Sequence, residues 1–177
     1  MLRTILIYGA ISGSIAAGFL VSIAVLGDSG MLKFDTYSYG MYVGYATMLV
    51  ALSMVYFGTR SYRDNVLGGS IGFWKAAAVG ILITLLASLI YAAVWEIYVQ
   101  FRPDFMDKYI AGYLEKLRTD GTAIEKIEEL AAQFGQMREM YKNPLIRFAI
   151  TLTEILPVGI LVTLISSATL RKGSIEK

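Results

Sequence analysis

Few side chains in this chain of 177 residues are suited to chemistry. The sequence contains no Cys and no His, which removes thiolate nucleophiles, imidazole bases and the usual zinc ligands, and leaves carboxylates as general bases or metal ligands. Glu154 is the most informative carboxylate, because it is the single charge between residues 148 and 170. An ionisable group within such an apolar window is costly and usually faces other helices or a wet cavity.

Neighbouring residues extend Glu154 into a candidate polar site within the membrane. Pro157 removes the helical hydrogen bond to the Thr153 carbonyl, so a carboxylate and a carbonyl are expected together in the outer half of the bilayer. Glu96 is expected at a similar depth or higher, and two tyrosines of an earlier window lie deeper than an interfacial belt requires. The candidate intramembrane site comprises Glu154, Glu96, Tyr42, Tyr45, Thr153 and Arg147.

Two interpretations of this site are open. In the first, Glu154 is a structural acid that points between helices and is hydrogen-bonded to a tyrosine or paired with Arg147, while Glu96 is interfacial. In the second, Glu154 and Glu96 together bind an ion or a proton. No nucleophile and base pair is apparent, so we expect no enzyme, and neither a cofactor nor a metal is predicted.

The elements that position these residues are predicted from composition. Hydrophobic residues make up 56% of the chain and charged residues 17%, whereas soluble domains average roughly 45–50% and about 25%. Four windows reach the length of about 20 residues that a helix needs to cross a bilayer. We expect an all-α membrane protein, a single integral membrane domain over residues 1–177, built as an antiparallel four-transmembrane-helix bundle with spans at about 4–26, 37–58, 73–98 and 146–170.

The basic residues predict the orientation of these spans. Short loops with an excess of Lys and Arg stay on the cytoplasmic side. Such residues flank the chain ends and the second loop, whereas the first loop, 27–35, holds only Lys33; the cytoplasmic set is Arg3, Arg60, Arg63, Lys75, Arg171, Lys172 and Lys177. Both termini are therefore expected to be cytoplasmic. The loop residues Arg60, Arg63 and Lys75 form either a plain positive-inside turn or a contact for anionic lipid or a partner.

Residues 103–142 predict an amphipathic helical hairpin outside the membrane, between spans three and four. Apolar residues recur at helical spacing on both sides of Gly121, which fits a helix stop. Thr122 followed by Glu125 fits a capping box, so we expect a helix from Thr122 to Tyr141. Asn143 and Pro144 then open the fourth span. The hairpin either packs on the bundle or is a docking platform.

Small residues predict close helix contacts. Gly9 and Gly13 form one G-x-x-x-G step, continued by Ala17, and Gly40 with Gly44 forms a second. In the third span, small residues recur every fourth position until the series reaches Glu96: Gly72, Ala76, Gly80, Thr84, Ser88 and Ala92. These contacts form either within the bundle or between two copies of the chain.

Two stretches carry a resemblance to a known family. Phe57-Gly58, Tyr62-Arg63-Asp64, Gly68-Gly69 and Phe73-Trp74-Lys75-Ala76 form the first stretch, and Glu154-Ile155-Leu156-Pro157-Val158-Gly159 with Leu164-Ile165-Ser166 forms the second. The chain resembles the bacterial four-span proteins of the domain of unknown function 4199 family. This resemblance implies a bacterial inner-membrane protein of four helices, and no activity.

The sequence as a whole favours a non-enzymatic accessory or scaffold component of the membrane. The expected partners are membrane lipids and either a second copy of the chain or another membrane protein. A small ion- or proton-linked transport protein that uses the intramembrane glutamates is the alternative. Nucleic acid is not an expected partner, because the net charge of +2 is small and scattered.

Overall fold

The protein is helical throughout the part described by the computed structural model, residues 1–28 and 36–172. The six helices are α1 (Leu2–Asp28), α2 (Thr36–Val66), α3 (Phe73–Phe101), α4 (Phe105–Thr119), α5 (Ile124–Tyr141) and α6 (Pro144–Leu170). Helices α1, α2, α3 and α6 contain the four segments long and apolar enough to cross a membrane. The predicted fold class is therefore confirmed. Lys33 and Lys177, used above for orientation, lie outside the described residues.

The chain forms two compact units. The first unit, which we call the bundle, comprises Met1–Trp95 and Thr151–Lys177. The second, which we call the hairpin unit, comprises Glu96–Ile150 and so contains the end of α3, the helices α4 and α5, and the start of α6. The expectation of a single domain over residues 1–177 stays a prediction.

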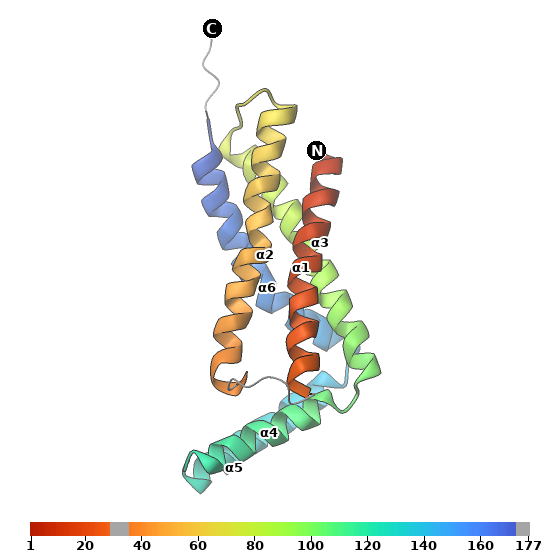
Figure 1. Ribbon diagram of the computed structural model, residues 1–177, viewed down its shortest axis with the longest axis vertical. Coiled ribbons are helices and arrows are strands. Elements are labelled where there is room, and N and C mark those ends of the chain that lie inside the picture. The colour runs from red at the N-terminus through yellow and green to blue at the C-terminus, as the bar shows by residue number, and fades with distance from the viewer. Residues whose placement is uncertain (29–35, 173–177) are drawn as a thin grey trace. The chain divides into compact units, whose positions relative to one another are not determined.

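Within the bundle, α1 and α2 lie side by side and antiparallel (Figure 1). The buried Ser12 hydroxyl of α1 donates a hydrogen bond of 2.8 Å to the Ala51 carbonyl of α2. This bond satisfies a polar side chain in an apolar interior, where an unpaired hydroxyl would be costly.

Helix α3 is the central helix of the bundle, because each of the other three approaches it through a glycine. A β-carbon added at these glycines would clash with an α3 side chain: 2.8 Å from Leu86 at Gly9, 2.6 Å from Ile83 at Gly58, and against Thr84 at Gly159. The contact predicted for Gly9 is confirmed, and Gly13 packs equally closely, 2.8 Å from Ile90. Small residues thus allow close backbone approach, as is usual between membrane helices.

The small-residue series of α3 itself is mostly buried. Positions 76, 80, 84, 88 and 92 are all buried, whereas Gly72 at the start of the series is exposed. The Thr84 hydroxyl lies 3.1 Å from the Thr163 hydroxyl of α6, so within the bundle small side chains and hydroxyls join these two helices.

The second predicted glycine contact is wrong for Gly44. A β-carbon at Gly44 would have no atom within 4 Å. The physical reason is that α2 packs only from its middle onward: none of its side chains with a described burial is buried before Met48. The outer turns of α2 therefore present an open surface.

Large apolar side chains cover the outside of the spanning helices. Examples are Leu6 on α1, Val50 on α2, Leu89 on α3 and Leu161 on α6, which are between 49% and 65% exposed. Such a surface would be unfavourable in water but matches lipid chains. The chain is accordingly a multi-pass membrane protein.

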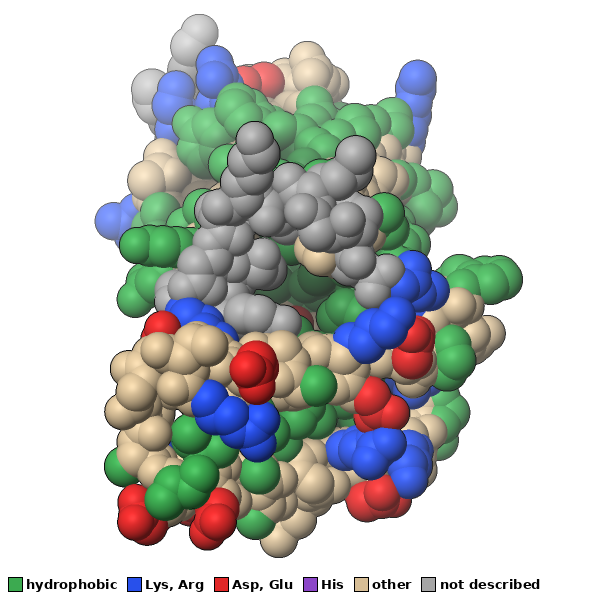
Figure 2. Space-filling model, turned by 60° about the horizontal axis from the view of Figure 1, so that its bottom comes forward, with side chains coloured by type: hydrophobic (Ala, Val, Ile, Leu, Met, Phe, Trp, Pro, Cys, Tyr) green, Lys and Arg blue, Asp and Glu red, His purple; other side chains and the backbone are tan. Residues whose placement is uncertain are grey.

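The two helices of the hairpin are joined by one aromatic contact and one ion pair. Tyr113 and Phe134 meet edge to face at 5.5 Å between ring centroids, and the Arg138 Nε lies 2.6 Å from the Asp107 carboxylate. Ile127 is the one buried residue among the described side chains of α4 and α5. Figure 2 shows both basic and acidic side chains spread over one face of the hairpin. The hairpin predicted for residues 103–142 is confirmed.

The turn between α4 and α5 differs from the expectation in one respect. Gly121 has a φ of +75° and ends α4, as predicted. The Thr122 amide donates to the Leu117 carbonyl at 3.0 Å, which completes a Schellman motif at the end of α4. Thr122 therefore belongs to the preceding helix end, and α5 begins at Ile124 with Ala123 at its N-cap. The predicted start at Thr122 was wrong.

Candidate functional site

Glu154 lies on the outer face of α6, exposed, and not between helices as predicted. Thr151, Ile155, Gly159 and Thr163 form the buried face of this helix. Glu154 directly precedes Ile155 and is therefore turned by about 100° from that residue. Its carboxylate makes no hydrogen bond or ion pair with another described residue. The expected tyrosine or Arg147 partner is thus a wrong prediction.

The surroundings of Glu154 on α6 are apolar. Leu161 and Ile165, two and three turns further along the same side of the helix, are 55% and 56% exposed. Thr153 is also exposed. A carboxylate therefore stands within an outward-facing strip of leucine and isoleucine, where lipid chains would otherwise be its neighbours.

The two tyrosines of the candidate site also face outward. Tyr42 is 67% exposed and Tyr45 is 48% exposed. Both lie in the first turns of α2, before Met48, where no side chain with a described burial is buried. The prediction that they line an enclosed polar pocket with Glu154 was wrong.

Glu96 and Arg147 form the one buried ion pair of the hairpin unit among the described residues. The Arg147 Nε donates to Glu96 Oε2 at 2.7 Å, and a second guanidinium nitrogen donates to Oε1, so the contact is bidentate. The two side chains are only 16% and 11% exposed. The Arg147 Nη1 donates to the Tyr141 carbonyl at 2.8 Å, and the guanidinium carbon lies 5.5 Å from the centre of the Tyr141 ring. All the donor nitrogens of Arg147 thus have acceptors at this corner.

Sequence reasoning named both members of this pair but did not join them. Glu96 and Arg147 are 51 residues apart. Glu96 lies near the end of α3 and Arg147 near the start of α6. The predicted topology places the end of the third span and the start of the fourth span at the same membrane boundary. This shared position was the one indication in the sequence that Glu96 and Arg147 could form a pair.

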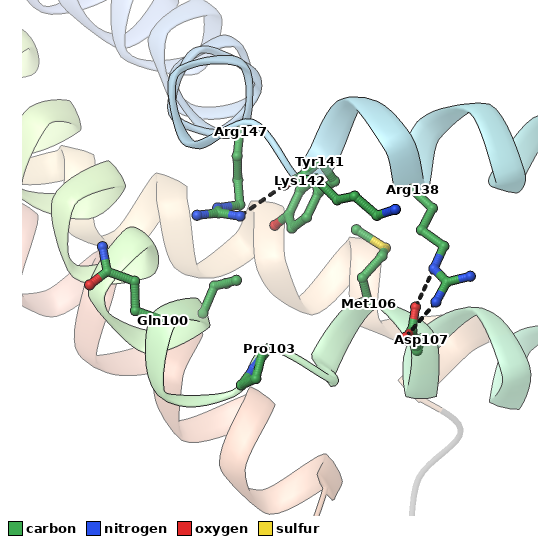
Figure 3. A pocket seen from close by; sticks show the side chains of 9 residues that line it. Gln100, Pro103, Met106, Asp107, Arg138, Tyr141, Lys142 and Arg147 are labelled. Atoms are coloured by element: carbon green, nitrogen blue, oxygen red, sulfur yellow. Dashed lines mark hydrogen bonds and ion pairs between the residues drawn. The ribbon is translucent and has the colours of Figure 1, made fainter.

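A pocket of about 320 Å³ lies beside this ion pair (Figure 3). Its apolar lining comes from Val99, Pro103, Met106 and Tyr141, and its polar lining from Gln100, Asp107, Arg138, Lys142 and Arg147. Arg138 is held by Asp107, with a second hydrogen bond of 2.8 Å, and the Lys142 ammonium donates to the Glu139 carboxylate at 2.7 Å. All the lining residues belong to the hairpin unit.

A further ion pair lies at the start of α4. The Lys108 ammonium lies 2.6 Å from the Asp104 carboxylate, and its hydrogen bond lowers the pKa of that carboxyl from its usual value. Asp104 is the N-cap of α4, so its negative charge also faces the positive end of the helix dipole. This carboxylate therefore stays ionised at neutral pH.

The basic residues at the end of α2 and the start of α3 have separate roles in the structure. Arg63 is buried, donates to the Leu170 carbonyl at the end of α6 at 3.3 Å, and is bound by Asp64 at 2.7 Å. Arg60 lies 3.6 Å from the same Asp64 and is exposed, as is Lys75. Of the three, Arg60 and Lys75 are the side chains open to lipid or to a partner.

Four apolar spanning helices and a charged amphipathic hairpin define a class, that of small multi-pass helical membrane proteins. Residues 5–172 match the family model described as "Protein of unknown function (DUF4199)", and the chain belongs to this family. This confirms the resemblance noted from the loop and fourth-span residues. No curated protein and no solved structure matches the chain.

Proposed function

We infer that the protein is a non-enzymatic accessory or scaffold component of the bacterial inner (cytoplasmic) membrane, with both termini cytoplasmic. The observation that carries this proposal is the position of Glu154, exposed on the outer face of α6 among leucines and isoleucines. A charged residue at the centre of a membrane helix costs about 2.5–3.5 kcal/mol on insertion scales, so such groups normally have a polar partner.

The partner of Glu154 is therefore expected from outside this chain. A donor on the helix of a second copy or of another membrane protein would satisfy the carboxylate and remove it from lipid. Gly44 supports the same interpretation, because a β-carbon at this glycine would have no described atom within 4 Å. The surface at Glu154 and the surface at Gly44 thus both have features that are typical of contacts between membrane helices.

Affinity purification in mild detergent tests this proposal. The chain should be recovered in a complex larger than its own mass of 19.5 kDa. Replacing Glu154 by Leu should reduce recovery of the complex, because the polar contact is lost, while the variant still inserts. Leu89→Ala, a change on the exposed surface of α3, is the matched control and should leave the complex intact. Recovery of wild-type protein as a free monomer alone would contradict the proposal.

The orientation rests on the basic residues of the short loops and is tested separately. Reporter fusions after Lys177 and within the loop at Arg60 should be active only as cytoplasmic reporters. Fusions within α5 should behave as exported ones. An exported carboxyl terminus would refute the orientation but would leave the accessory role untouched.

No specific observation supports ion- or proton-linked transport, the alternative function considered from the sequence. Glu96 is occupied by Arg147, and the pocket beside that pair is not lined by Glu154. Without two available carboxylates in one cavity, the accessory role is the better supported proposal.

A further inference from the structure

The pocket of the hairpin unit lies where the membrane ends. Val99 and Gln100 belong to the last winding of α3, and Arg147 belongs to the first winding of α6. Both helices are candidate spans, so their ends on this side mark the bilayer boundary. The phosphates of lipid headgroups lie at this level, outside a hydrocarbon core about 30 Å thick.

The lining of the pocket matches a molecule with an anionic head and an apolar body. Three of its side chains are cationic and one is anionic: Arg138, Lys142 and Arg147 against Asp107. Its remaining lining is largely apolar, and its volume of about 320 Å³ lies at the lower end of the range of about 300–1,000 Å³ that is usual for small-molecule sites.

The cations differ in how readily a ligand can engage them. Each nitrogen of the Arg147 guanidinium donates to Glu96 or to the Tyr141 carbonyl, and the side chain is only 11% exposed, so Arg147 is held in place at one side of the pocket. Lys142 is paired with Glu139, and these side chains are 63% and 67% exposed. An exposed pair of this kind contributes little to stability, so an incoming phosphate can replace Glu139 as the partner of Lys142. Arg138 and its partner Asp107 are about half exposed and stand next to Lys142 in the lining.

We propose that this pocket binds the phosphate-bearing headgroup of an anionic phospholipid. Lys142 is the principal contact to the phosphate, Arg138 adds positive charge beside it, and Met106 and Tyr141 pack against the glycerol and the start of the acyl chains. The shared chemistry, an anionic phosphate, also exists in free phosphate, which has no apolar part for this lining to bury. The site is separate from Glu154 and does not depend on the accessory role.

Lipid titration of the full chain in detergent, followed by native mass spectrometry, tests the proposal. Wild-type protein should retain phosphatidylglycerol, and Lys142→Gln should weaken its retention about tenfold, the usual cost of one charge-assisted hydrogen bond. The charge reversal Lys142→Glu should weaken it further. Both substitutions are at an exposed side chain, and unchanged helix content in circular dichroism confirms that the variants are folded.

Lys126→Gln is the matched control. Lys126 forms the same kind of exposed pair with a carboxylate three residues away, Glu129, also at 2.7 Å, but does not line the pocket. It should leave phosphatidylglycerol retention unchanged. An equal loss in both variants would show a general attraction of the hairpin to anionic lipid and would overturn the proposal, as would equal retention by wild type and Lys142→Gln.

Two further ligands show whether the pocket binds the phosphate of a lipid headgroup or free phosphate. Phosphatidylcholine, whose headgroup has no net charge, should be retained less than phosphatidylglycerol. Inorganic phosphate should bind weakly. If inorganic phosphate binds in a manner that depends on Lys142 while phosphatidylglycerol does not, the pocket is a site for free phosphate and the lipid assignment is wrong.

Discussion

Removing Glu96 should destabilise the protein far more than removing an exposed carboxylate of the same hairpin. The Glu96→Ala substitution leaves the Arg147 guanidinium charged, 11% exposed, and without the acceptor for two of its donors. An unsatisfied buried donor costs about 1–3 kcal/mol, and breaking a buried ion pair from one side costs about 3–5 kcal/mol. We therefore expect a loss of about 3–5 kcal/mol in the free energy of unfolding.

The Asp107 and Arg138 pair is the internal control for this prediction. It is also bidentate and also joins two helices, with contacts of 2.6 and 2.8 Å, but its side chains are about half exposed. Asp107→Ala should cost about 0–1 kcal/mol, because water replaces the lost partner. Equilibrium unfolding of each variant in mixed micelles with increasing sodium dodecyl sulfate gives both values.

A double substitution distinguishes the net contribution of the ion pair from the cost of leaving one buried charge without its partner. Glu96→Met with Arg147→Met removes both charges and should recover most of the stability lost in Glu96→Ala, since apolar side chains of similar size often replace a buried pair without net cost. The part not recovered reports the Arg147 bond to the Tyr141 carbonyl. If Glu96→Ala costs no more than Asp107→Ala, the pair is screened by solvent and the reasoning is refuted.

Further substitutions test the close contacts and the turn by the same unfolding assay. Gly80→Ala should cost about 1–3 kcal/mol through overpacking, because the new methyl would lie 2.7 Å from Thr163, whereas Gly44→Ala should be neutral, with no atom within 4 Å. A loss at Gly44 comparable to that at Gly80 would contradict the packing described. Gly121→Ala should cost about 1–2 kcal/mol because of its φ of +75°, while Thr122→Ala should change little, since its hydroxyl caps no helix; the opposite order would support a capping box.

The spans and the hairpin were predictable because composition determines them. A run of about 20 uncharged apolar residues has few stable places other than a bilayer, and the turn at Gly121 needs a residue that accepts positive φ. Thr122 was misplaced for a local reason. The sequence pattern of a capping box does not reveal that the same residue already completes the end of the preceding helix.

The direction of Glu154 was not predictable from the pattern of its span. In a soluble helix the buried side is marked by apolar periodicity, but in α6 apolar residues such as Ile155 and Leu161 occur on the buried and the exposed side alike. Tertiary contacts identify the inner face, such as the packing of Gly159 against Thr84. The partnership of Glu96 with Arg147 depends in the same way on tertiary structure, because 51 residues separate them.

The central position of α3 has a consequence for how the protein is made. During synthesis α1 and α2 are available first and can pair through Ser12 and through Gly58, which lies against Tyr8. Gly9 and Gly13 of α1, in contrast, pack on Leu86 and Ile90 of α3 and lack these neighbours until the third span has entered the membrane. The remaining side of α3, at Gly80 and Thr84, packs on Thr163 and Gly159 of α6, so it stays open while the residues of the hairpin are translated. A chain that ends before α6 would therefore lack the partners of the Thr84 hydroxyl, and its three helices would present this group to lipid.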